Sequence, residues 1–162
     1  MRLGLLADSH GRAERTATAV RMLLDAHADV LIHLGDFETD VVIDELAGHP
    51  ARLVFGNCDF DVAGMTRYAQ SLDIQVDHPI GRLHIDGKVV AYTHGHENGL
   101  VSEAMDEQVD YLLHGHTHVA RDDREGKTRV INPGALHRAN RYTVALLDVA
   151  TDELTWLELP RT

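Results

Sequence analysis

The sequence lacks most of the features that would place a chain outside the cytoplasm. Its 162 residues include one cysteine, Cys58, so no disulfide can form within the chain, which agrees with a reducing compartment. The first apolar run is too short for a secretory signal and meets Asp8 at once, and no later run approaches the length of a membrane span. We therefore expect a soluble, cytoplasmic protein that has no membrane partner.

Basic residues are also scarce. The chain has 15 Lys and Arg residues against 26 Asp and Glu residues, which gives a formal net charge of -11. No run of lysine or arginine is present that could follow a phosphate backbone, so long-range electrostatics disfavour polymeric nucleic acid as a partner. Local charge at a site can oppose the net charge of a chain, which leaves small anionic substrates open.

Hydrophobic periodicity predicts a sheet built from alternating strands and helices. The length fits one domain over residues 1–162. Apolar runs predict strands over 2–7, 30–34 and 52–55, and helical spacing between them predicts helices over 13–27 and 41–47. This βαβαβ order predicts a parallel sheet. The rest is predicted as a loop over 56–68, hairpins over 82–93 and 119–132, a helix over 100–108, and strands over 111–113, 142–148 and 153–159.

Polar residues gather at the carboxyl ends of the predicted strands, each time beside a glycine. The five motifs are Asp8-Ser9-His10-Gly11, His33-Leu34-Gly35-Asp36, Gly56-Asn57-Cys58-Asp59, Thr93-His94-Gly95-His96 and Gly115-His116-Thr117-His118. Because ligands of open α/β sheets bind outside the carboxyl ends of strands, these motifs can converge on one crevice. Neutral imidazole is the commonest protein metal ligand, so the histidines favour a metal site over a solvated polar loop.

Together with Asn132-Pro133-Gly134, these motifs resemble those of the calcineurin-like metallophosphoesterases. Within that family they are similar to the small YfcE-type phosphodiesterases of bacteria and archaea. The motifs follow the family's order from residue 8 to residue 134, so the resemblance covers nearly the whole chain. It implies an α/β fold, namely a four-layer αββα sandwich of two mixed β-sheets flanked by helices.

The resemblance also implies a site for two divalent metal ions. It assigns Asp8, His10 and His118 to one ion, Asn57, His94 and His116 to the other, and Asp36 as a bridge between them. Asp36 has two oxygens that can join two cations, and Asp36, Asn57 and His94 are the residues expected in catalysis. Mixed imidazole and carboxylate ligation suits transition metals better than calcium, so manganese is our first choice, with Fe, Ni, Co and Zn as alternatives.

For function, the resemblance implies hydrolysis of a small phosphate ester, first of all a phosphodiester. The attacking group would be a hydroxide that bridges the two ions, displacing the leaving group in line. One alternative is a phosphomonoesterase. Another is a non-catalytic scaffold like the retromer subunit of the same fold, which we disfavour because all seven ligand positions hold suitable residue types. A homo-oligomer is left open.

Two positions depart from the wider family. Cys58 stands where many members have a histidine near the leaving group, so a strong general acid is missing. We expect Cys58 to pack as a small apolar residue rather than to donate a proton. Ala135 stands where a serine is expected after Asn132-Pro133-Gly134, which puts a side-chain hydroxyl there in doubt.

The remaining polar residues near the motifs have weaker predicted roles. Asp59 is expected to fix the Asn57 loop, and Arg12 and Arg138 to contact an anion. His96 and His114 flank the assigned ligands and are expected either to orient them or to touch substrate. Of the other histidines, we expect a buried His33 and exposed positions for His27, His49, His78 and His84.

Overall fold

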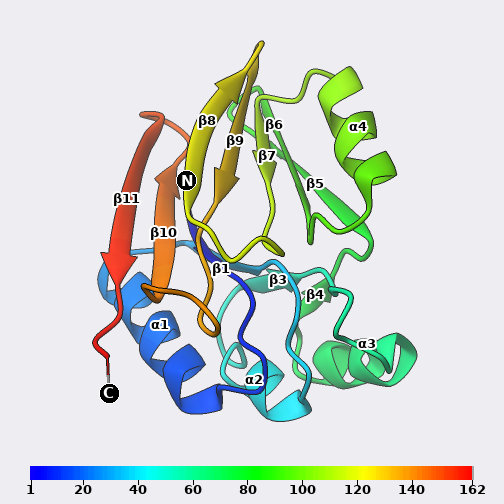
Figure 1. The fold of residues 1–162 in the computed structure, drawn as a ribbon, viewed down its shortest axis with the longest axis vertical. Coiled ribbons are helices and arrows are strands. Elements are labelled where there is room, and N and C mark those ends of the chain that lie inside the picture. The colour runs from blue at the N-terminus through cyan, green and yellow to red at the C-terminus, as the bar shows by residue number, and fades with distance from the viewer. Residues whose placement is uncertain (162) are drawn as a thin grey trace.

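Two β-sheets pack face to face between two layers of helices in the computed structural model, which describes residues 1–161 (Figure 1). The first sheet, called sheet A, has the strand order β11-β10-β1-β2-β3-β4. Its strands are β1 (Arg2–Leu6), β2 (Val30–His33), β3 (Ala51–Leu53), β4 (Gln75–Val76), β10 (Thr143–Asp148) and β11 (Glu153–Glu158). Strands β1 to β4 are parallel, and β10 and β11 extend the sheet antiparallel.

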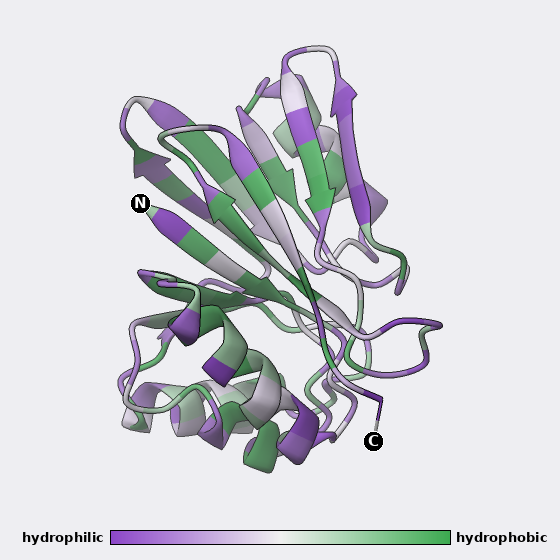
Figure 2. Ribbon diagram, turned by 90° about the vertical axis from the view of Figure 1, so that its left-hand side faces the viewer, coloured by the Kyte–Doolittle hydropathy of each residue, from purple (hydrophilic) through white to green (hydrophobic). Residues whose placement is uncertain are grey.

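The second sheet, called sheet B, has the strand order β5-β6-β7-β9-β8. Its strands are β5 (Ile80–Ile85), β6 (Lys88–Thr93), β7 (Tyr111–Leu113), β8 (Arg121–Glu125) and β9 (Thr128–Asn132). Strands β6, β7 and β9 are parallel, whereas β5 and β8 pair antiparallel at the two edges. Strand β8 is hydrophilic along its length (Figure 2), and its charged side chains discourage pairing with another chain.

Helices cover the outer face of each sheet (Figure 1). Sheet A is covered by α1 (Ala13–Asp25), α2 (Asp40–Asp44) and α3 (Val62–Ser71), and sheet B by α4 (Asn98–Asp106). Both faces of the central strands are therefore buried, so their apolar residues run continuously instead of alternating. On β7, for example, Tyr111 and Leu113 pack between the sheets while Leu112 packs toward Ala104 of α4. The predicted four-layer sandwich is confirmed.

The predicted loop over 56–68 is wrong in its second half, because α3 begins at Val62. The side chain of Asp61 caps this helix by accepting a hydrogen bond of 2.9 Å from the amide of Gly64. Met65 and Ala69, one helical turn apart, bury the inner face of α3. Gly64 has low helix propensity and concealed the pattern. The two-residue strand β4 was also missed, because so short a strand has no periodicity to detect.

Among the described residues, no helix is both long and apolar enough to cross a bilayer.

Candidate metal centre

The carboxyl ends of five strands meet at one edge of the two sheets. Strands β1, β2 and β3 run parallel in sheet A, and β6 and β7 run parallel in sheet B. The residues that follow them include all seven predicted ligands, which are Asp8, His10, Asp36, Asn57, His94, His116 and His118. The fold thus brings together residues separated by up to 110 positions, from Asp8 to His118.

Four of these residues form one tight cluster. Asp8, His10, Asp36 and His118 each offer a ligand atom, and these atoms all lie within 4.8 Å of one another. The Nε2 atoms of His10 and His118 are 3.2 Å apart. His118 Nε2 is 3.4 Å from Asp8 Oδ1, and His10 Nε2 is 3.6 Å from Asp36 Oδ2. Two carboxylates and two imidazoles around one point form a donor set that suits a transition metal ion.

The remaining three predicted ligands form a second group around His94, which also contacts Asp36. His94 Nε2 is 3.4 Å from Asp36 Oδ2 and 3.1 Å from Asn57 Oδ1. The rings of His94 and His116 meet edge to face, with centroids 5.2 Å apart. The same Asp36 oxygen therefore lies within 3.6 Å of His10 and 3.4 Å of His94, between the two groups of ligands.

Three of the histidines are fixed in one orientation by hydrogen bonds from Nδ1. His94 donates to the carbonyl oxygen of Leu34 at 2.7 Å, and His10 donates to Glu38 Oε1 at 2.6 Å. His118 Nδ1 lies 3.3 Å from the carbonyl oxygen of Arg138. Because a carbonyl can only accept, Nδ1 carries the proton in His94 and His118, and Nε2 turns a lone pair toward the cluster. Glu38 was missed by sequence reasoning; its only signal is an acidic residue two positions after Asp36.

An unpartnered oxygen tests whether this cluster fits a cation. Asp8 is fully buried, and its Oδ1 accepts no hydrogen bond from any described residue. A buried carboxylate oxygen without a partner is costly, and a divalent cation among these donors would remove that cost. The residues present therefore fit a metal ion.

Comparison with known proteins agrees with this geometry. Residues 1–152 match the calcineurin-like phosphoesterase superfamily domain. The chain belongs to this family. It is 26% identical to phosphodiesterase MJ0936 of Methanocaldococcus jannaschii over 160 residues, covering 94% of this chain and 96% of the relative. It is also 26% identical to phosphodiesterase YfcE of Escherichia coli strain K12 over 151 residues, covering 84% of this chain and 79% of that protein.

A solved structure described as a novel archaeal phosphodiesterase superposes with a TM-score of 0.89 at 24% identity, covering 98% of this chain and 100% of the other. That likeness supports the fold. The predicted membership of the calcineurin-like family, in its YfcE-type branch, is confirmed, and with it the prediction that the chain is a phosphoesterase.

Strained backbone surrounds the ligands of this phosphoesterase. Five of the seven have positive φ angles, namely Asp8 at 55°, His10 at 42°, Asp36 at 60°, His116 at 68° and His118 at 60°. Residues other than glycine adopt this conformation at some cost, and such strain clusters at functional sites. Gly56 permits the closest approach, because a Cβ atom there would lie 2.1 Å from Asp36 Oδ1. A Cβ atom at Gly35 would likewise lie 2.7 Å from His94 Nδ1, so these two glycines give Asp36 and His94 room to converge.

Asp59 joins the two loops that carry Asp36 and Asn57. Its Oδ2 accepts hydrogen bonds from the amides of Asp36 and Gly56 at 2.9 and 2.8 Å. Its Oδ1 accepts from the amides of Phe37 and Glu38, both at 2.8 Å. Burial raises the pKa of Asp59, while the four amide donors favour its ionised form. This is the arrangement expected of a residue that fixes the Asn57 loop.

Electrostatics at the cluster favour cation binding. Burial opposes ionisation of Asp36, but His94 and the amide of Cys58 bring its pKa well below the usual range. Burial also opposes protonation of His94, yet the neighbouring Asp36 and Asp8 carboxylates raise its pKa overall. The neighbouring Asp8 carboxylate raises the pKa of His118. Both upward histidine shifts reflect the same buried negative charge, which stabilises a nearby positive charge, whereas burial lowers the pKa of His116.

Cys58 is poorly suited to give up a proton. Burial and then the charge of Asp36 raise the pKa of its thiol to about 11. Its backbone amide donates a hydrogen bond of 2.9 Å to Asp36 Oδ1, so the residue holds Asp36 through its main chain. The role of the side chain stays a prediction.

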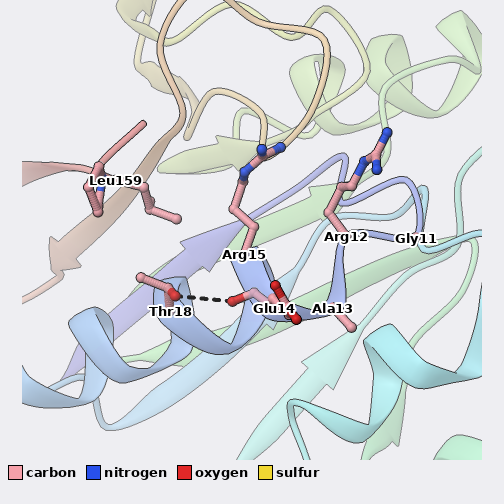
Figure 3. A pocket seen from close by; sticks show the side chains of 8 residues that line it. Gly11, Arg12, Ala13, Glu14, Arg15, Thr18 and Leu159 are labelled. Atoms are coloured by element: carbon pink, nitrogen blue, oxygen red, sulfur yellow. Dashed lines mark hydrogen bonds between the residues drawn. The ribbon is translucent and has the colours of Figure 1, made fainter. Parts of the chain in front are cut away.

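The arginines predicted to contact an anion lie at the rim of the site. Arg12 and Arg138 are both exposed. Figure 3 shows Arg12 and Arg15 projecting in the same direction from the start of α1, in a hollow of about 650 Å³. Arg15 donates a hydrogen bond to the carbonyl oxygen of Leu136 and lies 3.8 Å from the ring centroid of Tyr142. Among the described residues, Arg12 and Arg138 therefore present guanidinium groups beside the cluster that no other side chain engages.

Most of the other histidines differ in how deeply they are buried. His33 is buried as predicted, donating through Nε2 to Ser9 Oγ at 2.8 Å and accepting from the amide of Gly35 at Nδ1. His96 lies next to His94, with ring centroids 5.3 Å apart, and its buried Nδ1 has no partner among the described residues. His27 and His84 are exposed as predicted, but the same prediction is wrong for His49 and His78, which are half-buried; His78 accepts a hydrogen bond from the amide of Phe55 at 3.2 Å.

Proposed function

We propose that this chain is a phosphodiesterase that uses two divalent transition-metal ions, manganese first. The observation that carries the proposal is the position of Asp36, whose Oδ2 lies 3.6 Å from His10 and 3.4 Å from His94. A carboxylate between two groups of imidazole ligands is the arrangement that a pair of ions requires. The names of the two phosphodiesterase relatives support the same substrate class.

Each residue of the cluster has a defined task in this proposal. Asp8, His10 and His118 would hold one ion, Asn57, His94 and His116 would hold the other, and Asp36 would contribute to both. When bound, the two ions supply Lewis acidity that polarises a phosphoryl oxygen and makes water a better nucleophile near neutral pH. The carbonyl oxygens of Leu34 and Arg138 keep His94 and His118 oriented for ligation.

Charge at the site favours an anionic ester in spite of the net charge of the chain. The charges of two divalent ions outweigh the two carboxylates, Asp8 and Asp36, that face them. Arg12 and Arg138 at the rim add positive charge where a phosphate ester would approach. The net charge of -11 thus lies elsewhere and disfavours only long nucleic acid chains.

The leaving group receives little help from this chain. The thiol at Cys58, with a pKa of about 11, is a weak general acid at neutral pH. We therefore propose that the enzyme acts best on esters whose leaving group departs readily, and that aryl diesters are better substrates than simple alkyl diesters. Three further predictions stand: the substrate is small, the protein is cytoplasmic, and the chain forms one domain. The oligomeric state is left open.

The test couples metal analysis to a substrate panel. Purified protein is assayed with bis(p-nitrophenyl) phosphate and with p-nitrophenyl phosphate before and after removal of metal by a chelator. We expect about two ions per chain, faster hydrolysis of the diester, and loss of activity that added manganese restores. Preference for the monoester would favour the phosphomonoesterase alternative. Protein that binds metal but hydrolyses no ester in the panel would favour the retromer-like scaffold.

A further inference from the structure

A groove beside His118 is unexplained by the metal cluster. It has a volume of about 660 Å³, and His118 is one of the residues that line it. An adjoining hollow of about 350 Å³ shares His118, Val119, Ala139 and Asn140 with it, so the two are continuous. Volumes of this size are typical of small-molecule sites. A group bound in this groove would lie against one of the candidate metal ligands.

Exposed apolar side chains are concentrated in this groove. Five large hydrophobic residues are exposed among the described residues, and two of them, Val119 at 65% and Trp156 at 39%, line it. Trp156 lies on the same face of β11 as Leu154, which packs into the core between the sheets. The indole therefore stands at the open edge of this core, with part of its ring surface facing the groove.

Charged residues in the groove are already balanced. Asp122 forms two contacts of 2.8 Å with the guanidinium of Arg129. Arg141 Nη1 lies 3.7 Å from Glu158 Oε2. The groove itself therefore offers little excess charge to attract an anionic group, whereas Arg138 lines the adjoining hollow and Arg12 lies at the rim beside His10. Asn140 supplies an amide that can donate to and accept from a polar heterocycle.

We infer that the groove between Val119 and Trp156 holds a neutral aromatic substituent of the substrate, such as a nucleoside, while its phosphate lies at the metal cluster. This inference rests on the proposed function and names the substrate class. The shared lining residue His118 supports a substrate group as the occupant, because a substituent esterified to a phosphate at the cluster would begin beside a residue that also lines the groove. An aromatic group can stack on the partly exposed indole of Trp156, which stabilises it more than an alkyl group of similar size. The amide of Asn140 can form hydrogen bonds with the edge of a base.

Two substrates with the same leaving group test this inference. One is the p-nitrophenyl ester of thymidine 5′-phosphate and the other is methyl p-nitrophenyl phosphate, so only the retained substituent differs. We expect the ratio of kcat/KM for the nucleoside ester to that for the methyl ester to fall at least about fivefold in Trp156→Leu, a factor that corresponds to about 1 kcal/mol. Val119→Ser should lower the ratio less, and Trp156→Phe should restore most of it because the ring is kept.

Val41→Ser is the matched control, because Val41 is also exposed, at 56%, but lies on α2 outside the groove. This variant should leave the ratio unchanged. A ratio that is the same in Trp156→Leu and in the wild type would overturn the inference even if both esters are hydrolysed, and the proposed function would still stand.

Fluorescence gives a readout that needs no turnover, because Trp156 is the only tryptophan in the chain. Thymidine 5′-monophosphate should change its emission saturably in manganese-loaded protein, and methyl phosphate should not. If neither ester is hydrolysed, the proposed function fails, but saturable quenching would still support the groove. A second copy of the chain that covers the groove would overturn the inference. It would show as a Trp156 emission maximum that shifts with protein concentration, together with a dimer in sedimentation that Trp156→Leu abolishes.

Discussion

Replacing Asp59 by asparagine should destabilise the protein severely, although the two side chains have nearly the same shape. Both carboxylate oxygens of Asp59 accept two backbone hydrogen bonds each, at 2.8 to 2.9 Å. An asparagine offers one accepting oxygen and one donating amide group. In either orientation, its amide group would face two backbone N–H donors in a buried position. The variant therefore loses two hydrogen bonds and leaves those two donors unpaired.

The magnitude follows from the number of bonds lost. A hydrogen bond to a charged group contributes about 1.5 to 3 kcal/mol, so the loss of two should lower the free energy of unfolding by about 3 to 6 kcal/mol. That loss is a large part of the total free energy of unfolding of a typical domain, which is about 5 to 15 kcal/mol. The damage is also local to the site, because the lost bonds join the loops that carry Asp36 and Asn57. We expect the variant to bind less metal than the wild type.

Urea unfolding measures the first effect, and metal analysis of the purified protein measures the second. Asp61→Asn in the same loop is the matched control. Asp61 caps α3 with one hydrogen bond, and asparagine caps helices about as well, so this change should alter stability by less than about 0.5 kcal/mol. If Asp59→Asn also lay within about 1 kcal/mol of the wild type, our view of Asp59 as an obligate acceptor of four amides would be wrong.

Three further predictions concern the site and its surroundings. Asp36→Asn should keep the fold but lower metal occupancy and slow diester hydrolysis at least about a hundredfold, and full turnover by this variant would contradict a bridging role. Burial lowers the pKa of His33 to about 3, below the value of about 6.5 expected for the unfolded chain. The stability that neutral His33 contributes is complete above about pH 6.5 and is lost toward pH 3. Urea unfolding should therefore give a free energy of unfolding about 2 kcal/mol lower at pH 5 than at pH 7.5 because of this residue. The same pH dependence should be shallower in His33→Gln. Cys58→Ala should change the rate on aryl diesters by less than about threefold, whereas a steeper dependence on leaving-group pKa in this variant would show that the thiol donates a proton.

Local sequence was sufficient for the strand ends and for the chemistry placed there. A buried strand followed by glycine and a polar residue is a pattern within about ten residues, and motifs such as Thr93-His94-Gly95-His96 display it directly. The family followed from the order of these motifs, and the sandwich followed from the family. Helix α3 was missed because Gly64 weakened a pattern that depends on only two buried residues, Met65 and Ala69.

Only the tertiary structure decided which side chains meet. Glu38 contacts His10 and Asp59 accepts the amides of three residues more than twenty positions away, and neither contact leaves a periodic signal in the sequence. The groove that joins His118 to Trp156 depends on packing sheet A against sheet B, since Trp156 lies on β11 of sheet A and His118 lies in the loop between β7 and β8 of sheet B. Sequence periodicity records which face of an element is buried, whereas the partner across a sheet interface is set by packing between elements far apart in the chain.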